Sequence, residues 1–132
     1  EIVPLSSQVL KSDQDFRFEL RYKITQDIPV RFGISIIDEK SGGSASIIDD
    51  QLRGPNGELR LSSTSKGEYS FKYKLPLKLF NNRDFYVKAS LFKIEGDKSE
   101  IVAYIPDEKV CRFAVRGGEY DGGLLRQKGE WL

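Results

Sequence analysis

The run from Phe16 to Ile24 alternates apolar and charged side chains without a fault. Because successive side chains of a β-strand point to opposite faces, such a run places one set in a core and the other in water. The same period of two returns from Val30 to Asp38, from Tyr69 to Leu75 and from Phe85 to Phe92, and no stretch shows a convincing helical period. The chain is therefore predicted to consist of half-buried strands.

Shorter apolar stretches between turn residues predict the remaining strands. Pro4 cannot donate to a ladder, so the first strand is expected to be an edge strand or an interrupted one. The short strands are expected from Ile2 to Leu10, from Ala45 to Ile48, near Leu59 and Leu61, from Ile101 to Ile105 and from Val110 to Val115. About eight or nine strands without helices predict an all-β fold, an immunoglobulin-like antiparallel β-sandwich. The strands at Val30, Phe85 and Val110 are expected to share one sheet.

Composition limits the classes of partner. The 132 residues are enough for a core, and we expect residues 1–132 to form a single β-sandwich domain. A net charge of +1 argues against nucleic-acid binding, and no apolar run approaches the roughly 18 residues that span a bilayer, so direct membrane insertion is not expected. With Cys111 as the only cysteine, the expected compartment is the reducing cytoplasm. Since the chain holds no methionine, we expect it to be excised from a longer chain.

The outward positions of the three strands expected in one sheet form the candidate binding surface. Tyr86 and Phe92 offer rings on which the C–H faces of sugars stack, and neighbouring basic and hydroxyl side chains donate hydrogen bonds. Small residues predict a shallow floor, at Gly33, Ser35, Ser90 and Ala114. The candidate carbohydrate-binding residues are Arg31, Ser35, Tyr86, Lys88, Ser90, Phe92 and Arg112. The alternative, which pattern alone favours, is an ordinary solvated face.

Neither catalysis, nor a metal site, nor a cofactor is expected. The chain has no histidine, which removes Ser/His and Cys/His nucleophile pairs and most zinc sites. Cys111 alternates with core residues and is expected to be a buried, inert thiol. The carboxylate pairs are expected to serve turns and not a glycosidase or calcium site: Asp13 with Asp15, Asp49 with Asp50, and Asp107 with Glu108. The opposite outward set mixes both signs and predicts a solvated face: Arg17, Glu19, Arg21, Lys23, Ser70, Lys72 and Lys74.

The order of motifs along nearly the whole chain carries a family resemblance. The motifs run from Phe16 to Tyr22, from Val30 to Asp38 before a Gly turn, from Gly67 to Phe71, from Leu79 to Leu91, and from Phe113 to Val115 before a Gly-rich segment that ends near Trp131. In this order they resemble the carboxy-terminal carbohydrate-binding domain of Wzt, the ATP-binding subunit of bacterial O-antigen polysaccharide ABC transporters.

The resemblance implies a non-catalytic module of lipopolysaccharide biosynthesis, which recognises lipid-linked O-polysaccharide in the cytoplasm, at the inner face of the inner membrane. It implies an ATPase domain before Glu1, which would bind the ATP, and a transmembrane subunit of the exporter as partner. It also implies a homodimer that exchanges its last strand. Leu124, Leu125 and Trp131 fit this expectation, because they are too apolar for a free tail and follow flexible glycines. The family's pocket is not matched residue by residue, so the outward set stays the candidate site.

A second reading remains open from the residues. A generic immunoglobulin-like or fibronectin-like module would dock a protein through a strand edge or a loop. A glycan reader loses affinity when Tyr86 or Arg31 becomes Ala while its melting temperature is kept, whereas an edge-docking module is indifferent to both changes. A β-sandwich hydrolase is disfavoured by the missing histidine and by the carboxylates in turns.

Overall fold

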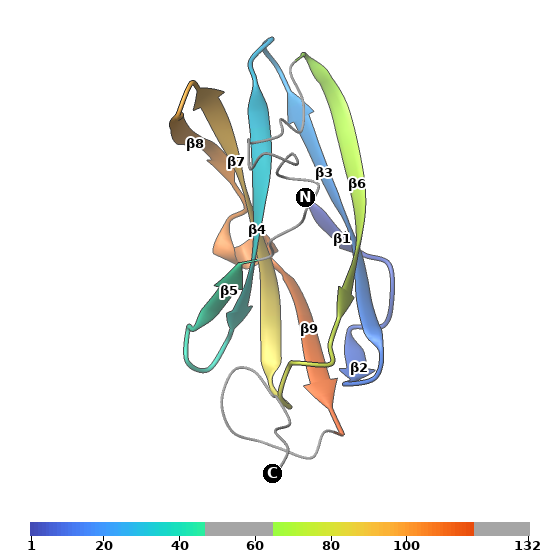
Figure 1. The fold of residues 1–132 in the computed structure, drawn as a ribbon. Helices are drawn as coiled ribbons and strands as arrows, with labels where there is room; N and C mark the ends of the chain where they lie inside the picture. The colour runs from blue at the N-terminus through green and yellow to red at the C-terminus, as the bar shows by residue number, and fades with distance from the viewer. Residues whose placement is uncertain (47–64, 118–132) are drawn as a thin grey trace, which may run out of the picture.

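The computed structural model describes residues 1–46 and 65–117 and forms two packed β-sheets (Figure 1). A three-stranded sheet has the order β1-β3-β6. The larger sheet has the order β2-β9-β7-β4-β5, with β8 also paired to β7. In chain order the strands are β1 Ile2–Pro4, β2 Val9–Lys11, β3 Asp15–Ile24, β4 Val30–Asp38, β5 Ser44–Ser46, β6 Gly67–Pro76, β7 Asp84–Glu95, β8 Lys98–Tyr104 and β9 Cys111–Arg116, and η2 Asp107–Lys109 is a short 3-10 turn. The predicted all-β sandwich is confirmed.

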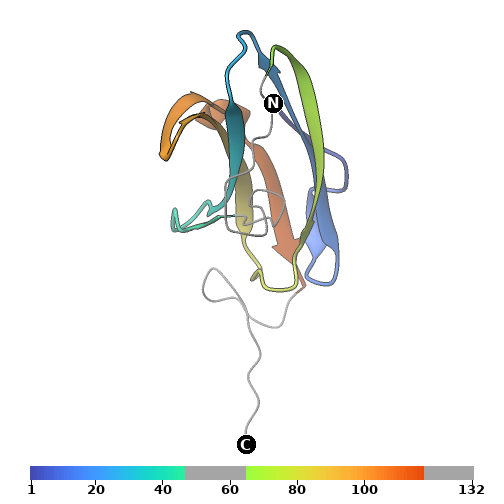
Figure 2. The ribbon, with the colours of Figure 1, turned by 45° about the horizontal axis from the view of Figure 1, so that its top comes forward.

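The first strand is interrupted as Pro4 predicts. β1 pairs antiparallel with β3, whereas β2 pairs parallel with β9 in the other sheet. The chain therefore changes sheets between β1 and β2, and Figure 2 shows both sheets tilted so that this edge is visible. After Pro76 the chain crosses again, and Leu77 and Phe80 are buried on the way from β6 to β7.

The inward sets of the two sheets meet in one core. Phe16 and Phe18 of β3 are fully buried, as are Phe85 and Val87 of β7. The Phe113 ring stacks on Phe16 with centroids 4.6 Å apart and on Phe85 at 5.4 Å. Because a slip of one residue would turn these rings outward, the core fixes which side chains of each strand face water.

Two strand predictions differ from the structure in extent. The strand predicted to start at Ile101 begins at Lys98, because Gly96 adopts φ +60° and closes a two-residue hairpin loop directly after β7. Every residue of β8 is exposed, so no inward set marked its start in the sequence. The predicted strand from Ala45 to Ile48 is seen as β5, with Ile47 and Ile48 outside the described residues. Leu59 and Leu61 also lie outside them.

Within the two described ranges, no helix is long and apolar enough to cross a bilayer. Cys111 is buried as predicted, and burial raises the pKa of its thiol.

Candidate functional site

The outward side chains of the larger sheet line up in rows. Arg31 of β4 lies opposite Phe92 of β7, and Ser35 lies opposite Lys88. Tyr86 of β7 lies opposite Ile37 of β4 on one side and opposite Arg112 of β9 on the other. Since residues directly opposite on antiparallel strands share a face, the predicted site residues do emerge from one sheet surface. We call this surface the β7 face and define it as Arg31, Gly33, Ser35, Ile37, Tyr86, Lys88, Ser90, Phe92, Ile101, Tyr104 and Arg112.

Most of the β7 face is half buried. The residues of β4 and β7 that belong to the β7 face are all intermediate in exposure, including Ile37 and Tyr86. On the opposite sheet the outward residues of β6 are exposed, although Glu19 of β3, predicted on a solvated face, is buried. The β7 face is therefore more enclosed than the plain solvated surface that the sequence left as an alternative.

Phe92 and Arg31 form a stacked pair at one end of the β7 face. The guanidinium carbon of Arg31 lies 5.0 Å from the centroid of the Phe92 ring. A Cβ atom on Gly33 would come within 2.9 Å of Cε2 of Phe92, so the ring lies across β4 at this glycine. The expectation that Phe92 is a free stacking platform and Gly33 an open floor is wrong, because the ring fills the space over Gly33 and supports the guanidinium.

Lys88 occupies the middle of the β7 face and is paired. Its Nζ lies 2.8 Å from Oδ1 of Asp107, in the 3-10 turn between β8 and β9. The hydrogen bond to Asp107 raises the pKa of Lys88, and the negative charge of that carboxylate adds to the effect. The same bond lowers the pKa of Asp107. This carboxylate therefore neutralises a cation, which explains one of the acidic turn residues without catalysis.

Tyr86 and Arg112 form the other end. Nε of Arg112 lies 2.7 Å from Oε1 of Glu39, and its side chain is 59% exposed. The backbone carbonyl of Arg112 accepts a hydrogen bond from Nε2 of Gln8 at 2.7 Å. β9 is thereby tied to the turn after β4 and to the chain before β2.

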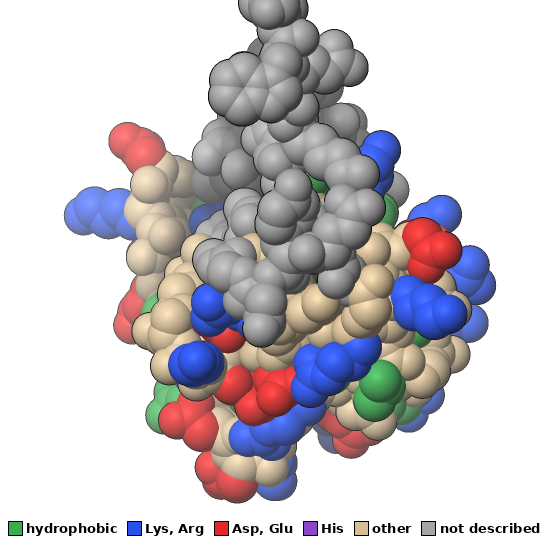
Figure 3. Space-filling model, turned by 90° about the horizontal axis from the view of Figure 1, so that it is seen from below, with side chains coloured by type: hydrophobic (Ala, Val, Ile, Leu, Met, Phe, Trp, Pro, Cys, Tyr) green, Lys and Arg blue, Asp and Glu red, His purple; other side chains and the backbone are tan. Residues whose placement is uncertain are grey.

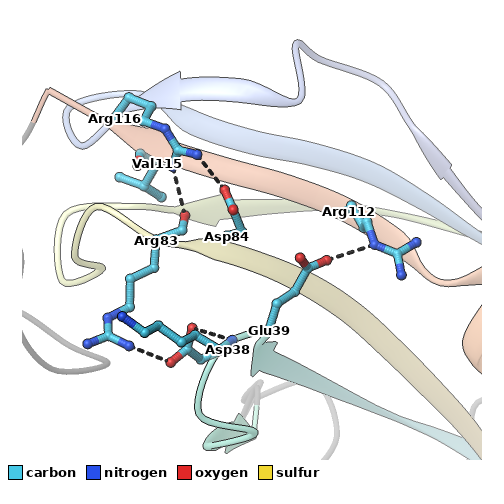
Figure 4. A network of polar contacts seen from close by, with 8 residues as sticks. Asp38, Glu39, Arg83, Asp84, Arg112, Val115 and Arg116 are labelled. Atoms are coloured by element: carbon cyan, nitrogen blue, oxygen red, sulfur yellow. Dashed lines mark hydrogen bonds and ion pairs between the residues drawn. The ribbon is translucent and has the colours of Figure 1, made fainter.

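A network of ion pairs underlies this end of the sheet (Figure 4). Nη1 of Arg83 lies 2.8 Å from Oδ2 of Asp38, which is 1% exposed, and Nη2 of Arg116 lies 2.6 Å from Oδ1 of Asp84. Burial alone raises the pKa of Asp38, but hydrogen bonds from Ser41, the Lys40 backbone and Arg83 outweigh it, and the pKa is lowered. Viewed from below, basic and acidic side chains lie interspersed over the part of the surface that is not drawn in grey (Figure 3).

β8 contributes two residues to the β7 face that sequence reasoning missed. Tyr104 lies opposite Ser90 and Ile101 opposite Phe92, with exposed fractions of 72% and 57%. The sequence predicted a strand here, joined to the Phe85 strand by a hairpin loop, but the outward residues of this strand were not counted in the candidate site. The available signal was the polar hairpin between Glu95 and Lys98, which places β8 beside the distal half of β7.

A cavity of about 260 Å³ opens next to these residues, between the two sheets. Residues 20–23 of β3, residues 89–91 of β7, residues 103–105 and Glu1 line it. Ser90 and Tyr104 belong both to this cavity and to the β7 face, so the surface continues around the edge of the sheet.

The outward set of the smaller sheet, which we call the β3 face, is mostly basic and holds one close ion pair, between Arg21 and Glu19. Glu19 is held by Nε of Arg21 at 3.1 Å and accepts a hydrogen bond from the Ser70 hydroxyl. These bonds, that from Arg21 foremost, lower the pKa of Glu19 from its ordinary value of 4.5 to about 2. The β3 face consists of Arg17, Glu19, Arg21, Lys23, Glu68, Ser70, Lys72 and Lys74.

The structure describes only some of the acidic and apolar residues that the sequence analysis singled out. Asp13 lies in the turn between β2 and β3, and Asp15 begins β3. In residues 1–46 and 65–117, acidic and cysteine side chains form no cluster that could hold a metal ion. Asp49 and Asp50 lie outside these residues, as do Leu124, Leu125 and Trp131, which were predicted to dimerise.

The fold matches a solved structure closely enough to compare the whole domain. The superposition on the crystal structure of the C-terminal domain of Wzt includes 99% of this chain and 78% of that one. The TM-score is 0.66 and the sequence identity is 16%. No protein-family model matches the sequence, and no curated protein matches it either. The resemblance drawn from the order of the motifs is confirmed as a likeness of fold.

Proposed function

We propose that this domain binds carbohydrate on the β7 face, and that its ligand is the lipid-linked O-antigen polysaccharide that an ABC transporter exports. The observation that carries the proposal is a half-enclosed sheet surface on which aromatic rings alternate with hydrogen-bonding groups. Sugars need both, because their C–H faces stack on rings and their hydroxyls exchange hydrogen bonds with charged and hydroxyl side chains. The likeness of fold to the C-terminal domain of Wzt supports the transport context.

Different parts of the β7 face take different roles in this proposal. Tyr86 and Tyr104 offer ring surface, while Ser35 and Ser90 supply hydroxyls between them. From position 31 to position 37 of β4 the surface extends roughly 20 Å, at about 3.3 Å per residue. A ligand that touches both ends is therefore a chain of several sugars, as a polysaccharide is.

The wider setting follows from the same proposal. The domain acts without catalysis or a cofactor of its own, as a homodimer in the cytoplasm, attached to an ATPase domain and working with the transmembrane subunit of the exporter. Two copies would raise the avidity of a shallow glycan site for a repeating polymer.

Calorimetric titration of the domain with O-polysaccharide from the organism that encodes it tests the proposal. Tyr86→Ala and Tyr104→Ala should each weaken binding by about tenfold, as the loss of a tyrosine at the centre of an interface does. Leu79→Ala is the matched control, because Leu79 is 52% exposed but lies on the connection between the sheets. It should leave the affinity within about twofold. Equal losses in all three variants, or no binding by the unaltered domain, would refute the proposal.

A protein-docking module is the second candidate, and one observation favours it. β8 pairs only with β7 in the part of the chain that the structure describes, and it exposes Ile101, Val102 and Tyr104. Such an edge accepts a strand from a partner. Val102→Lys separates the two functions, because it should abolish strand docking and leave polysaccharide binding intact. Melting temperatures of the variants, measured alongside, exclude simple unfolding.

A further inference from the structure

The β7 face carries three basic side chains, and two are already neutralised. Lys88 is paired with Asp107 at 2.8 Å, and Arg112 with Glu39 at 2.7 Å. Arg31 forms neither an ion pair nor a hydrogen bond within residues 1–46 and 65–117. It is therefore the basic group of this surface whose charge is not neutralised by any described residue.

Arg31 is also held in place. Its guanidinium lies over the Phe92 ring, 5.0 Å from the centroid, and its Nε atom is buried without a hydrogen-bond partner. The ring attracts the cation but accepts none of its N–H groups in an ordinary hydrogen bond. A guanidinium prepared in this way loses little conformational entropy when a ligand arrives, since packing has already restricted it.

We propose that Arg31 binds an anionic group of the glycan, a carboxylate or a phosphate, so that the polysaccharide read by this domain is acidic. The proposal rests on the carbohydrate function proposed above and names the class of ligand for the same surface. A guanidinium donates two parallel hydrogen bonds to such a group, and these charge-assisted bonds are about twice as strong as neutral ones. The unneutralised charge of Arg31 would then find a partner.

The position of Arg31 confines the charge of the ligand to one end of the β7 face. Ser35, which faces Lys88, lies four positions after Arg31 on β4, a distance of roughly 13 Å. Lys88 and Arg112 already carry their own carboxylates, so the rest of the surface suits neutral sugar units. The inferred ligand therefore presents its anionic group beside Phe92 and neutral hydroxyls beside Ser35, Ser90 and Tyr86.

Chemical removal of the charge from the ligand tests the inference. The purified O-polysaccharide is titrated into the domain untreated, after reduction of its carboxyl groups to alcohols, and after removal of phosphate with hydrofluoric acid. One of the two treatments should lower the affinity by at least about tenfold, as loss of a hydrogen-bonded charge does, and the treatment that does so identifies the anion. A polysaccharide that contains neither group, or that binds equally well after both treatments, overturns the inference.

Variants of Arg31 assign the effect to this side chain. Arg31→Gln should lower the affinity for the untreated polysaccharide by at least about tenfold and leave the affinity for the neutralised one within about twofold. Arg31→Lys keeps the charge but loses the planar donors and should fall between the two. Lys74→Gln on the β3 face should change neither affinity. If Arg31→Gln keeps the preference for the charged form, the inference is wrong. If charged and neutral forms bind the unaltered domain equally, only this inference falls, whereas failure of both to bind removes the carbohydrate function as well.

Discussion

The two outer surfaces of the sandwich are built from the same alternation but differ in chemistry. On the β3 face, Glu19 is bound by Arg21 of its own strand and by Ser70 of the neighbouring strand, and the outward residues of β6 are exposed. On the β7 face the outward residues of β4 and β7 are half buried and include Tyr86 and Phe92. Charged residues dominate the first surface, and aromatic and small residues much of the second.

The difference shows where a ligand gains free energy. Charged side chains that stand in water, as most of those on the β3 face do, offer a ligand little net free energy, because solvent already hydrates and screens them. Arg31 differs, because an aromatic ring holds it and its Nε has no hydrogen-bond acceptor. A cation that an aromatic ring holds on a partly enclosed surface, more than exposed charge, distinguishes the β7 face.

The largest expected effect is on stability, at the ion pair between Asp38 at the end of β4 and Arg83 just before β7. Asp38→Asn leaves the Arg83 guanidinium without its buried carboxylate and should lower the free energy of unfolding by roughly 3 kcal/mol. Asp84→Asn breaks a pair whose members are both about half exposed, and should cost less than about 1 kcal/mol. Urea denaturation measures both values. Equal costs would show that the ion pair of Asp38 does not hold β4 and β7 in register.

Filling the space over Gly33 should remove the distinctive end of the β7 face. A side chain at this position meets the Phe92 ring, so Gly33→Val displaces the ring and the guanidinium that it supports. We expect the affinity for O-polysaccharide to fall by about tenfold, since an anchoring arginine is lost. Ser70→Val on the β3 face is the matched control, and calorimetry should show unchanged binding for it. Unchanged binding by Gly33→Val would mean that Phe92 and Arg31 take no part.

A smaller effect, on affinity, should follow when Lys88, a second cation of the β7 face, loses its ion-pair partner. Asp107→Ala leaves Lys88 without its carboxylate, so the affinity for an acidic polysaccharide should rise by about threefold at low salt and return toward the original value at high salt. The melting temperature should hardly change, because the pair is 37% and 85% exposed and such pairs stabilise little. A fall in affinity would instead indicate that Asp107 itself contacts the ligand.

The smallest effect concerns acid stability and belongs to the β3 face. The pKa of Glu19 is lowered from 4.5 in an ordinary environment to about 2 in the fold. Its contribution to stability is therefore complete above the ordinary pKa and is lost as the pH falls toward the lowered one. Thermal unfolding followed as a function of pH should show a shallower decline in this window for Glu19→Gln. Polysaccharide binding near pH 7 should be the same in both proteins.

Alternation of side chains was sufficient to predict the sandwich and the orientation of its long strands. Val30, Ile34, Phe85 and Val87 are buried where the period of two placed them, because a buried face leaves one register open to each strand. The crossing between sheets after Pro76 could likewise be predicted, since proline ends a ladder.

The finer structure of the candidate site could not be predicted, because it depends on neighbours distant in sequence. The stacking of Phe92 under Arg31 requires the glycine at position 33, which pairs with Ser90 on the adjacent strand. The position of Tyr104 follows from β8, which has no buried residue to fix its register in the sequence. The partner of Lys88 comes from a turn beyond β8. Strand period carries none of this information.

The most direct test of the account asks which outer surface the polysaccharide touches. Backbone amide resonances of the labelled domain are followed by NMR while O-polysaccharide is added. We predict that the shifts gather on the outward residues of β4, β7 and β9 and at Tyr104, with the largest near Arg31 and Tyr86, while the β3 face stays unchanged. Shifts that gather on Glu19, Lys72 and their neighbours instead, with the β7 face silent, would contradict the account.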